Sequence, residues 1–417
     1  MKEKYLVINA GSSSLKFSLY TMPEAKEIVN GLVERIGNED SCYTLKYDGK
    51  KQEKNKVIMN HTEAVKTMLE ELLANNFISD INEIKGVGHR VLHGAEIYKE
   101  STLINEETLR NLEGLVKFGP LHLPGAIAGI KSMMQYLDVP QVAVFDTSFH
   151  NTIPEENYRY AVPEEFYTQD GVRKYGFHGT SYRYITKEMQ KRYEKEDVNL
   201  IICHVGSGAS MCCVKDGKSY DTTMGLTPLA GLIMGTRSGD IDPSIIEYIC
   251  KERNLTVSEV TNILNKKSGL LGIAGKNDNR DLESARKNGD KKATLALEML
   301  KNSIEKYIGQ YYIELKGKVD AIVFTAGIGE NAISLRESII NDISVPLNIK
   351  LNKEMNDNIS RRSAYQGGKI STPDSSIEVL VLPTNEEYMI LKDTYEISKK
   401  IEEKIQEETN KKVLKLN

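Results

Sequence analysis

The sequence lacks the features that would mark a membrane, metal-cluster or nucleic-acid-binding protein. Its 417 residues include no tryptophan and only five cysteines, at positions 42, 203, 212, 213 and 250. These cysteines show no paired spacing of the metal-binding type, so we interpret them as reduced thiols of a cytoplasmic protein. We expect no signal peptide and no membrane span, because no apolar run is long enough. The net charge of −4 offers no basic surface for nucleic acid.

Length and composition predict a globular protein of two domains. A chain of 417 residues is too long to be organised around one core. Its content of 40% hydrophobic and 27% charged residues is ordinary for such a protein.

The most informative stretch is Tyr5–Tyr20, YLVINAGSSSLKFSLY. Two apolar runs flank a polar turn from Asn9 to Ser14, which predicts a β-hairpin. Gly11 allows close approach of the backbone to a ligand, and the serines and Lys16 provide hydroxyl groups and a positive charge. Such a loop suits a phosphate group, although an ordinary hairpin turn is an equal alternative.

A second copy of this design favours the phosphate interpretation. Asn199–Val214, NLIICHVGSGASMCCV, again has two apolar runs around a glycine turn, His204–Gly208. Two such units about half a chain apart suggest a duplicated fold with a nucleotide between its halves. The sheet of the first half is expected to continue through 28–47.

Several charged residues fall where strands are predicted to end. Arg90 follows the strand in Lys85–Glu96, and Asp146 follows the buried strand in Val139–His150. Carboxylates at strand ends are typical of α/β active sites, and an arginine there can bind an anion through two hydrogen bonds. A surface ion pair is the alternative for Arg90. Arg237, in the glycine-rich loop 224–243, is a second candidate for anion binding.

Histidines gather in the same part of the chain. Six of the seven lie between His89 and His204, mostly in glycine-rich turns, and His178 is among them. A lone histidine is more often structural than catalytic, but this clustering favours a site.

The remaining elements are predicted from periodicity. We expect Thr62 to cap a first helix, a loop over 119–125 and a helix from Ala126. Further helices are expected at 244–253, at 257–265 with Ser258 as cap, at 293–315 and from Asn385 to about Lys411. A polar turn is expected at 276–281, a strand followed by a glycine turn and a helix from Val319, and a last strand at 379–383. The acidic residues that open the last helix could hold Mg²⁺ through water.

Together these motifs resemble the acetate kinase family of short-chain carboxylate kinases, within the superfamily of sugar kinases and actin. The resemblance runs from Val7 to about Thr394. It rests on NAGSSSLKF, GHRVLHG, PLH, VFDTSFH, YGFHGTS, MGTRSGDIDP, FTAGIGEN and PTNEE, in this order.

The resemblance implies ATP-dependent, reversible phosphorylation of acetate to acetyl phosphate by direct in-line transfer. The catalytic group would be Arg90, Asp146, His178 and Arg237. The nucleotide and its phosphates would contact Ser12, Ser14, Lys16, His204, Val205, Gly206, Ser207, Gly208, Asp278, Asn279, Arg280, Gly327, Ile328, Gly329, Glu330 and Asn331. The carboxylate would contact Arg90, Leu92, Leu121, His122, Phe177 and Pro228, and Mg²⁺ would be bound by Asn9 and Glu386.

The implied fold is α/β, with two duplicated actin-like (ribonuclease H-like) domains and a nucleotide cleft between them. The first domain would comprise residues 1–150 and 385–417, and the second, carrying the nucleotide site, residues 151–384. A homodimer through the second domain is also implied.

The chain departs from the usual family pattern at Leu92, Ala95, Leu123, Gly125, Tyr182, Ser207, Ala230 and Ala326. Ser207 stands where asparagine is usual, and Tyr182 where histidine is usual. Alanine replaces a usual glycine at positions 95 and 326, and Leu92 replaces a usual valine. The four catalytic candidates remain, so the sequence predicts an active enzyme. A propionate or butyrate kinase, or a nucleotide-binding paralogue without catalysis, stays open as an alternative.

Overall fold

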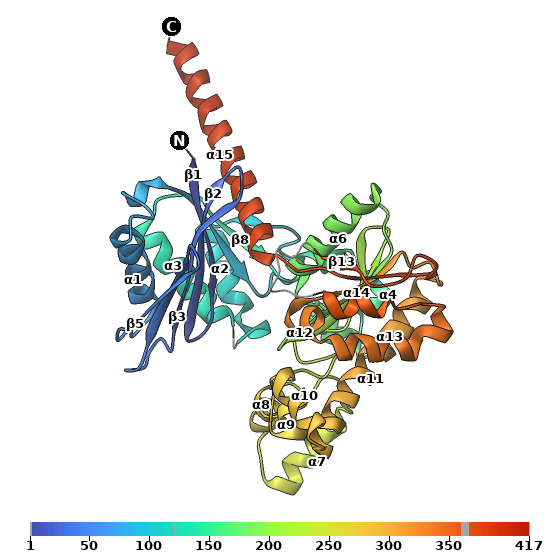
Figure 1. Cartoon of the computed structure of the whole chain (residues 1–417). Helices are drawn as coiled ribbons and strands as arrows, with labels where there is room; N and C mark the ends of the chain where they lie inside the picture. The colour runs from blue at the N-terminus through green and yellow to red at the C-terminus, as the bar shows by residue number, and fades with distance from the viewer. Residues whose placement is uncertain (1, 121, 360–366, 417) are drawn as a thin grey trace. The chain divides into compact units, whose positions relative to one another are not determined.

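The computed structural model describes residues 2–120, 122–359 and 367–416, which form two compact units. Unit 1 comprises Met1–Ser148 and Asn385–Asn417, and unit 2 comprises Phe149–Thr384. Each unit is built around one β-sheet with helices packed against it (Figure 1).

The sheet of unit 1 has the strand order β5-β4-β3-β2-β1-β6-β8-β7. Its strands are β1 (Glu3–Ala10), β2 (Ser14–Met22), β3 (Lys26–Glu34), β4 (Cys42–Tyr47), β5 (Lys50–Asn55), β6 (Ile84–Val91), β7 (Thr102–Leu103) and β8 (Gln141–Phe145). The predicted hairpin is confirmed as β1 and β2, and the predicted extension to Tyr47 as β3 and β4. The short edge strands β5 and β7 were not predicted.

The helices of unit 1 are α1 (His61–Ala74), α2 (Glu106–Gly114), α3 (Leu123–Tyr136) and α15 (Glu386–Leu416), with short 3₁₀ segments at Ile81–Glu83 and Leu115–Phe118. Two predicted starts are wrong. Asn60, not Thr62, caps α1, because its side chain accepts the Glu63 N–H at 2.9 Å. Residues 123–125 are helical rather than loop, since Pro124 suits the first turn of α3.

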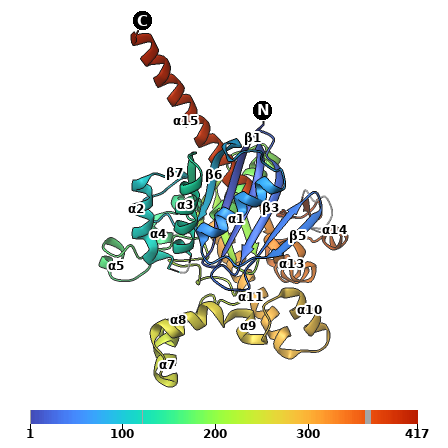
Figure 2. The same cartoon turned by 90° about the vertical axis from the view of Figure 1, so that its left-hand side faces the viewer.

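Strand β1 is buried on both faces, so its apolar run contributes to two cores. Leu6 and Ile8 pack with α1 and α3 on one face of the sheet, while Tyr5 and Val7 pack with α15 on the other (Figures 1 and 2). Successive residues of a strand point to opposite faces, which explains why this stretch is apolar throughout rather than alternating.

Helix α15 lies directly against the backbone of β6. A β-carbon placed on Gly88 would lie 2.2 Å from the Thr394 hydroxyl oxygen and 2.6 Å from a methyl carbon of Ile390. Glycine at this position therefore lets the helix approach the sheet. The same docking sets the first turn of α15, with Glu386, near the carboxyl end of β6.

The sheet of unit 2 has the strand order β11-β10-β9-β12-β14-β13. Its strands are β9 (Leu200–Val205), β10 (Ala209–Lys215), β11 (Lys218–Thr222), β12 (Ala321–Thr325), β13 (Gly368–Lys369) and β14 (Glu378–Val381). The second predicted hairpin is confirmed as β9 and β10, which pair antiparallel. Strand β12 lies parallel to both β9 and β14.

Helices of unit 2 cover the sheet and form a separate lobe. They are α4 (Glu155–Tyr158), α5 (Glu164–Thr168), α6 (Gly179–Tyr193), α7 (Ser244–Arg253), α8 (Val257–Lys266), α9 (Gly269–Ala274), α10 (Asn279–Lys287), α11 (Lys291–Glu314), α12 (Ala326–Asn331), α13 (Ile333–Leu347) and α14 (Lys353–Asn358). A 3₁₀ turn at Ser148–Thr152 spans the boundary with unit 1. Helices α7, α8, α9 and α10 gather in the lobe seen in both views (Figure 2).

Three predictions for unit 2 need correction. Thr256, not Ser258, caps α8, because it forms a capping box with Glu259. The expected glycine turn at 327–330 is the short helix α12. The expected polar turn at 276–281 already becomes helical at Asn279. The predicted loop at 224–243 is confirmed, since the structure has no helix or strand there.

Three alanines, including Ala25 with φ +52°, occupy backbone conformations that favour glycine. Ala95 has φ +48° and Ala326 has φ +66°, in the left-handed region. The latter two are the positions at which the family pattern usually has glycine. An L-residue in this region costs about 1 kcal/mol, so these alanines carry backbone strain.

All five cysteines are free thiols. Among the residues described, no helix is both long enough and apolar enough to cross a bilayer.

We predict that Gly88→Ala destabilises unit 1, because the new methyl group would collide with α15. The expected loss of unfolding free energy is about 1–3 kcal/mol, as for other overpacked cores. Urea denaturation followed by circular dichroism measures it. Gly114→Ala is the matched control, since no atom lies within 4 Å of its added β-carbon. Equal stability of the two variants would contradict the close packing.

We also predict that His89 makes the stability fall in acid. The ring is buried and its Nε2 lies 2.8 Å from Gln141 Oε1, and burial lowers the His89 pKa to about 4. The unfolded chain therefore binds a proton that the folded chain excludes, so stability is full above about pH 6.5 and declines towards pH 4.

The contribution at stake is roughly 3 kcal/mol. Urea titrations at several pH values should give a shallower decline for His89→Asn than for the unmodified chain. Parallel curves would show that His89 does not carry this dependence.

Candidate active site

Three elements of unit 1 converge on the Arg90 guanidinium group. Arg90 is the penultimate residue of β6, and Asp146 follows the neighbouring parallel strand β8. Arg90 Nε and Nη2 donate to the two oxygens of Asp146 at 2.9 and 2.8 Å. Its Nη1 lies 3.0 Å from Glu386 Oε2, in the first turn of α15. The structure thus places two predicted catalytic residues and one predicted metal ligand in one ion cluster.

The electrostatics of this cluster keep Arg90 charged. Burial by itself would lower the pKa of the guanidinium group, but the charges of Asp146 and Glu386 outweigh it and raise that pKa. Asp146 is 1% exposed and the Arg90 side chain about a quarter exposed. Both oxygens of Asp146 are engaged by Arg90, so the carboxylate orients the arginine rather than facing a substrate alone.

A second cluster joins the first hairpin to the same helix. The Lys16 ammonium group pairs with Glu387, and the other oxygen of Glu387 accepts hydrogen bonds from Ser18 Oγ and Tyr20 Oη, both at 3.2 Å. Burial and the Glu387 charge raise the pKa of Tyr20, which therefore stays a neutral donor. Asn9 lies opposite Lys16 in the β1–β2 register. The first turn of α15 is thus tied to Lys16, a predicted phosphate ligand, which lies opposite Asn9, a predicted metal ligand.

The hairpin turn itself is held by two other elements. The Gly11 N–H donates to Ser14 O at 2.8 Å, and His61 Nε2 lies 2.7 Å from Gly11 O. A β-carbon on Gly125 would lie 2.3 Å from that carbonyl oxygen, so the start of α3 abuts the turn. Ser12 is exposed and Ser14 half-buried. The turn is therefore rigidly held, with the Ser12 hydroxyl group facing solvent.

The predicted acyl-pocket residues of unit 1 are partly placed. A methyl carbon of Leu92 and the Leu123 side chain both lie 3.3 Å from the position of a β-carbon on Gly119. His122 is the residue that precedes α3. Leu121 lies outside the described residues.

In unit 2, His178 and Arg237 meet at the second glycine turn. A β-carbon on Gly208 would lie 3.4 Å from Arg237 Nη2 and 3.7 Å from His178 Nε2. His178 precedes α6 with a left-handed φ of +55°, and its ring stacks on His204 with centroids 4.1 Å apart. The buried Phe177 is its neighbour in the chain. Two predicted catalytic residues thus border a turn predicted to bind phosphate.

Arg237 lacks a carboxylate partner among the residues described in this structure. Its Nη1 donates to Pro228 O at 2.9 Å and lies 3.5 Å from the Met234 sulfur. Burial lowers the pKa of this guanidinium group. A partly buried cation whose side-chain hydrogen bonds to the described residues go to a carbonyl and a thioether is incompletely compensated, and an anion would complete its environment.

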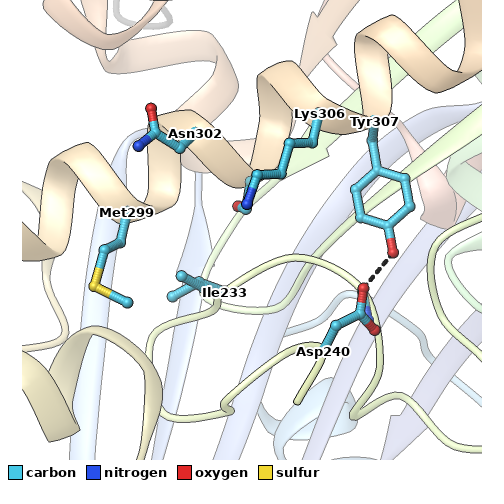
Figure 3. Close-up of a pocket in the computed structure, with 8 residues that line it drawn as sticks. Ile233, Asp240, Met299, Asn302, Lys306 and Tyr307 are labelled. Carbon is cyan, nitrogen blue, oxygen red and sulfur yellow. Dashed lines mark hydrogen bonds between the residues drawn. The ribbon is translucent and has the colours of Figure 1, made fainter. Parts of the chain in front are cut away.

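Hydrogen bonds between Gly231 and Asp240 close the base of the loop that carries Arg237. The Gly231 N–H donates to Asp240 Oδ1 at 2.7 Å, and the Asp240 N–H donates to Gly231 O at 3.0 Å. The other Asp240 oxygen accepts a hydrogen bond from Tyr307 of α11 (Figure 3). A pocket of about 340 Å³ lies between this loop and α11, lined by Ile233, Met299, Asn302, Ser303 and Lys306 as well.

The other predicted nucleotide-binding segments border the same turn. A β-carbon on Gly235 would lie 3.3 Å from Ser207 Oγ and 3.6 Å from Asn277, which precedes Asp278. A β-carbon on Gly206 would lie 3.8 Å from that of Ala326, at the start of α12. The structure therefore gathers residues of the His204–Gly208 turn and of the α10 and α12 starts.

Within these segments, several predicted side chains have local partners. Asp278 caps α10 and pairs with the exposed Arg280 at 2.6 Å, and that contact lowers the Asp278 pKa to about 2. Asn331 Nδ2 donates to Gly327 O at 2.7 Å, closing α12. The buried Arg336 donates to Gly329 O at 2.8 Å.

Sequence reasoning missed several residues that hold these groups in place. They are His61, Tyr182, Ser210, Asp240, Tyr307, Arg336 and Glu387. Asp240 and Glu387 stand in noted motifs, so their acidic side chains were a usable signal. Ser210 and Arg336 gave none, because their partners come from other elements of unit 2.

No group of three or more His, Cys, Asp or Glu residues in the described parts of the chain is arranged to hold a metal ion. Asn9, opposite Lys16 in the β1–β2 register, would supply an amide oxygen, and Glu386, beside Arg90, would supply a carboxylate oxygen. Mg²⁺ usually takes one or two protein oxygens and completes its shell with water and phosphate, so this donor set fits it.

Comparisons with known proteins agree with the motifs. A model of the acetokinase family matches residues 4–392. The acetate kinase of Bacillus velezensis is 47% identical over 399 residues, which cover 95% of this chain and 99% of that protein. The acetate kinase of Bacillus subtilis is 46% identical and covers 95% of this chain and 100% of that protein.

Solved structures give the same result. The acetate kinase of Porphyromonas gingivalis matches with a TM-score of 0.89 and 38% identity, covering 95% of this chain and 99% of that one. A propionate kinase from Francisella tularensis matches with a TM-score of 0.89 and 39% identity, covering 94% and 99%. The α/β fold with two sheets is therefore that of these kinases, and the chain belongs to the acetokinase family.

Proposed function

We propose that this protein catalyses the ATP-dependent, reversible phosphorylation of acetate to acetyl phosphate by direct in-line transfer. The observation that carries the proposal is the Arg237 guanidinium group. It is partly buried beside His178 and Gly208 and has no carboxylate partner among the described residues. Such a group suits the charge of a phosphoryl group in transfer.

The chemistry of the reaction fits these residue types. A carboxylate acceptor is already ionised at neutral pH, so the reaction needs no strong general base. The barrier is to bring two anions together in line and to stabilise charge on the equatorial oxygens of the phosphoryl group. Arginine and histidine donors supply that stabilisation, typically about 3 kcal/mol for each preorganised donor.

In unit 1, Arg90 would bind the acetate carboxylate. Asp146 and Glu386 hold its guanidinium group at 2.8–3.0 Å, which fixes the direction of its remaining donor hydrogens. Asp146 would act as a positioning residue and would not abstract a proton. Leu92, Leu121, Phe177 and Pro228 would bound the methyl group of the acid.

Asn9 and Glu386 would hold Mg²⁺ together with the phosphates of ATP. When bound, the ion neutralises charge on the nucleotide and its phosphoryl group. Lys16, Ser12 and Ser14 would contact the phosphates, and the His204–Gly208 turn with the starts of α10 and α12 would bind the nucleoside.

We further propose a cytoplasmic homodimer that associates through unit 2. The free state of all five thiols supports a reducing compartment. The exposed side chains that such an association could cover include Tyr248 of α7 and Leu295 and Ile313 of α11, at 63%, 53% and 73% exposure.

One alternative is a propionate or butyrate kinase with the same mechanism. The similarity to the Francisella tularensis propionate kinase favours keeping it open. A second alternative is a paralogue that binds nucleotide without catalysis. Ser207, which stands where asparagine is usual, would contribute to that loss of catalysis.

The test is hydroxamate formation from ATP, Mg²⁺ and acetate, propionate or butyrate. We expect kcat/KM to be highest with acetate and to fall about a hundredfold or more in Arg237→Ala, since one oxyanion donor is lost. Arg253→Ala is the matched control, because Arg253 is exposed at the end of α7.

Each other outcome selects an alternative. A maximum with propionate or butyrate would change the substrate and keep the mechanism. Clear ATP binding without turnover of any acid would favour the paralogue. Unchanged turnover in Arg237→Ala would overturn the role of this residue.

We predict that Asp146 causes no steep pH dependence of kcat near neutrality. Asp146 accepts two hydrogen bonds from Arg90 at 2.9 and 2.8 Å, so its role is orientation. The variant should lower kcat while keeping the shape of the pH profile between pH 6 and 8.5, about the range in which acetate stays ionised. A limb present only when Asp146 is intact would identify it as a general base.

A further inference from the structure

The His178 ring is held from one side by a buried hydroxyl group. Its Nδ1 lies 2.8 Å from Ser210 Oγ, on the neighbouring strand β10. Ser210 is fully buried, so this contact is shielded from water. The hydrogen on the serine oxygen therefore decides whether Nδ1 accepts or donates.

A second hydroxyl group fixes that choice. Tyr182 lies one turn further along α6, is fully buried, and forms a hydrogen bond to the same Ser210 oxygen. A phenol is far more acidic than an alcohol, so the tyrosine is the better donor and the serine the better acceptor. Once Tyr182 donates to Ser210, the serine hydrogen is left to point at His178 Nδ1. The proton of a neutral His178 ring then resides on Nε2.

The stacked neighbour His204 has a matching arrangement. Thr384 Oγ1 donates to Ser181 Oγ at 2.7 Å, and Ser181 Oγ lies 2.8 Å from His204 Nδ1. By the same reasoning, a serine oxygen that accepts from Thr384 is assigned to donate its own hydrogen to Nδ1. Two hydroxyl relays of the same design thus serve two rings whose centroids are 4.1 Å apart and whose planes are inclined by 17°.

The charge of the surroundings favours a neutral ring. His178 Nε2 and Arg237 Nη2 lie 3.7 and 3.4 Å from the same point, the position of a β-carbon on Gly208. A positive imidazolium would face the positive guanidinium group there and stack on a second imidazole. Two positive groups that border the same turn repel each other, whereas a neutral ring with a hydrogen on Nε2 adds a donor without repulsion.

We infer that Tyr182 and Ser210 are positioning residues that keep His178 neutral with its proton on Nε2, ready to donate to an oxygen of the transferring phosphoryl group. This rests on the proposed function. Tyr182 stands where the family pattern usually has histidine, so the phenol-to-serine relay is a property of this chain. No proton is transferred, since the relay sets direction only.

The first experiment reads the tautomer directly. Nitrogen-15 NMR of the histidine-labelled full chain should show His178 with hydrogen on Nε2 and an acceptor signal at Nδ1, with His178→Asn identifying the signals. In Tyr182→Phe, the serine hydrogen is free to turn away, and the two tautomers should both be populated. A ring protonated on Nδ1 in the unmodified chain, or a tautomer unchanged in Tyr182→Phe, would overturn the inference.

The second experiment measures kcat and KM for the same variants. Tyr182→Phe should lower kcat about tenfold and leave KM for ATP within about twofold, because orientation matters most in the transition state. Ser210→Ala should lower kcat further, and Ser210→Thr should restore most of it. Tyr193→Phe is the matched control, since it removes a 2.7 Å hydrogen bond to Glu378 from the same helix α6.

The outcomes separate this inference from the proposed function. An equal fall of kcat in Tyr182→Phe and Tyr193→Phe would indicate general loosening of α6 and overturn the inference, as would an unchanged kcat. Absence of turnover in the unmodified protein with any acid would reject the proposed function, and the NMR result would still decide the tautomer. If Tyr182→Phe does not fold, Ser210→Thr and Ser210→Ala provide the same comparison.

Discussion

The ion cluster around Arg90 is the contact on which the rest of unit 1 depends. It joins the carboxyl ends of two parallel strands to the first turn of α15, through Asp146 and Glu386. Charged groups this poorly exposed are stable only when their partners are in place. The sheet, the C-terminal helix and the candidate carboxylate site are therefore joined by one cluster of contacts. Gly88 also contributes to the position of α15, because it determines how closely this helix approaches β6.

The candidate arginine of unit 2 has the opposite electrostatic environment. Arg237 has no carboxylate partner among the described residues and donates to the Pro228 carbonyl, while Gly231 and Asp240 close the base of its loop. The two arginines thus differ in a way that suits two tasks. A compensated arginine is a fixed support for a carboxylate that binds and leaves, whereas an uncompensated one gains most when negative charge develops beside it. The neutral His178 ring adds a donor without adding charge.

Local sequence patterns account for much of the framework. Both hairpins, the strand before Asp146 and helix α7 were predicted, because apolar periodicity and glycine turns act within a few residues. Cap positions were less predictable. At α1 and α8, asparagine or threonine competes with a neighbouring hydroxyl residue, and the choice depends on how the chain enters the helix. The turn expected at 327–330 is helical, and the buried Arg336 donates to its backbone at Gly329 O, a contact that the local sequence does not reveal.

By itself, the sequence determined the family, the two hairpins and the residue types available for phosphoryl transfer, since these follow from short motifs in a fixed order. Only the tertiary structure decided which of these residues have partners. That Asp146 is committed to Arg90, that Glu387 bridges Lys16 and Tyr20, and that Tyr182 reaches Ser210 all depend on strands and helices distant in sequence. Hydrogen bonds and ion pairs act over a few ångströms, and only the folded chain brings their partners within that range.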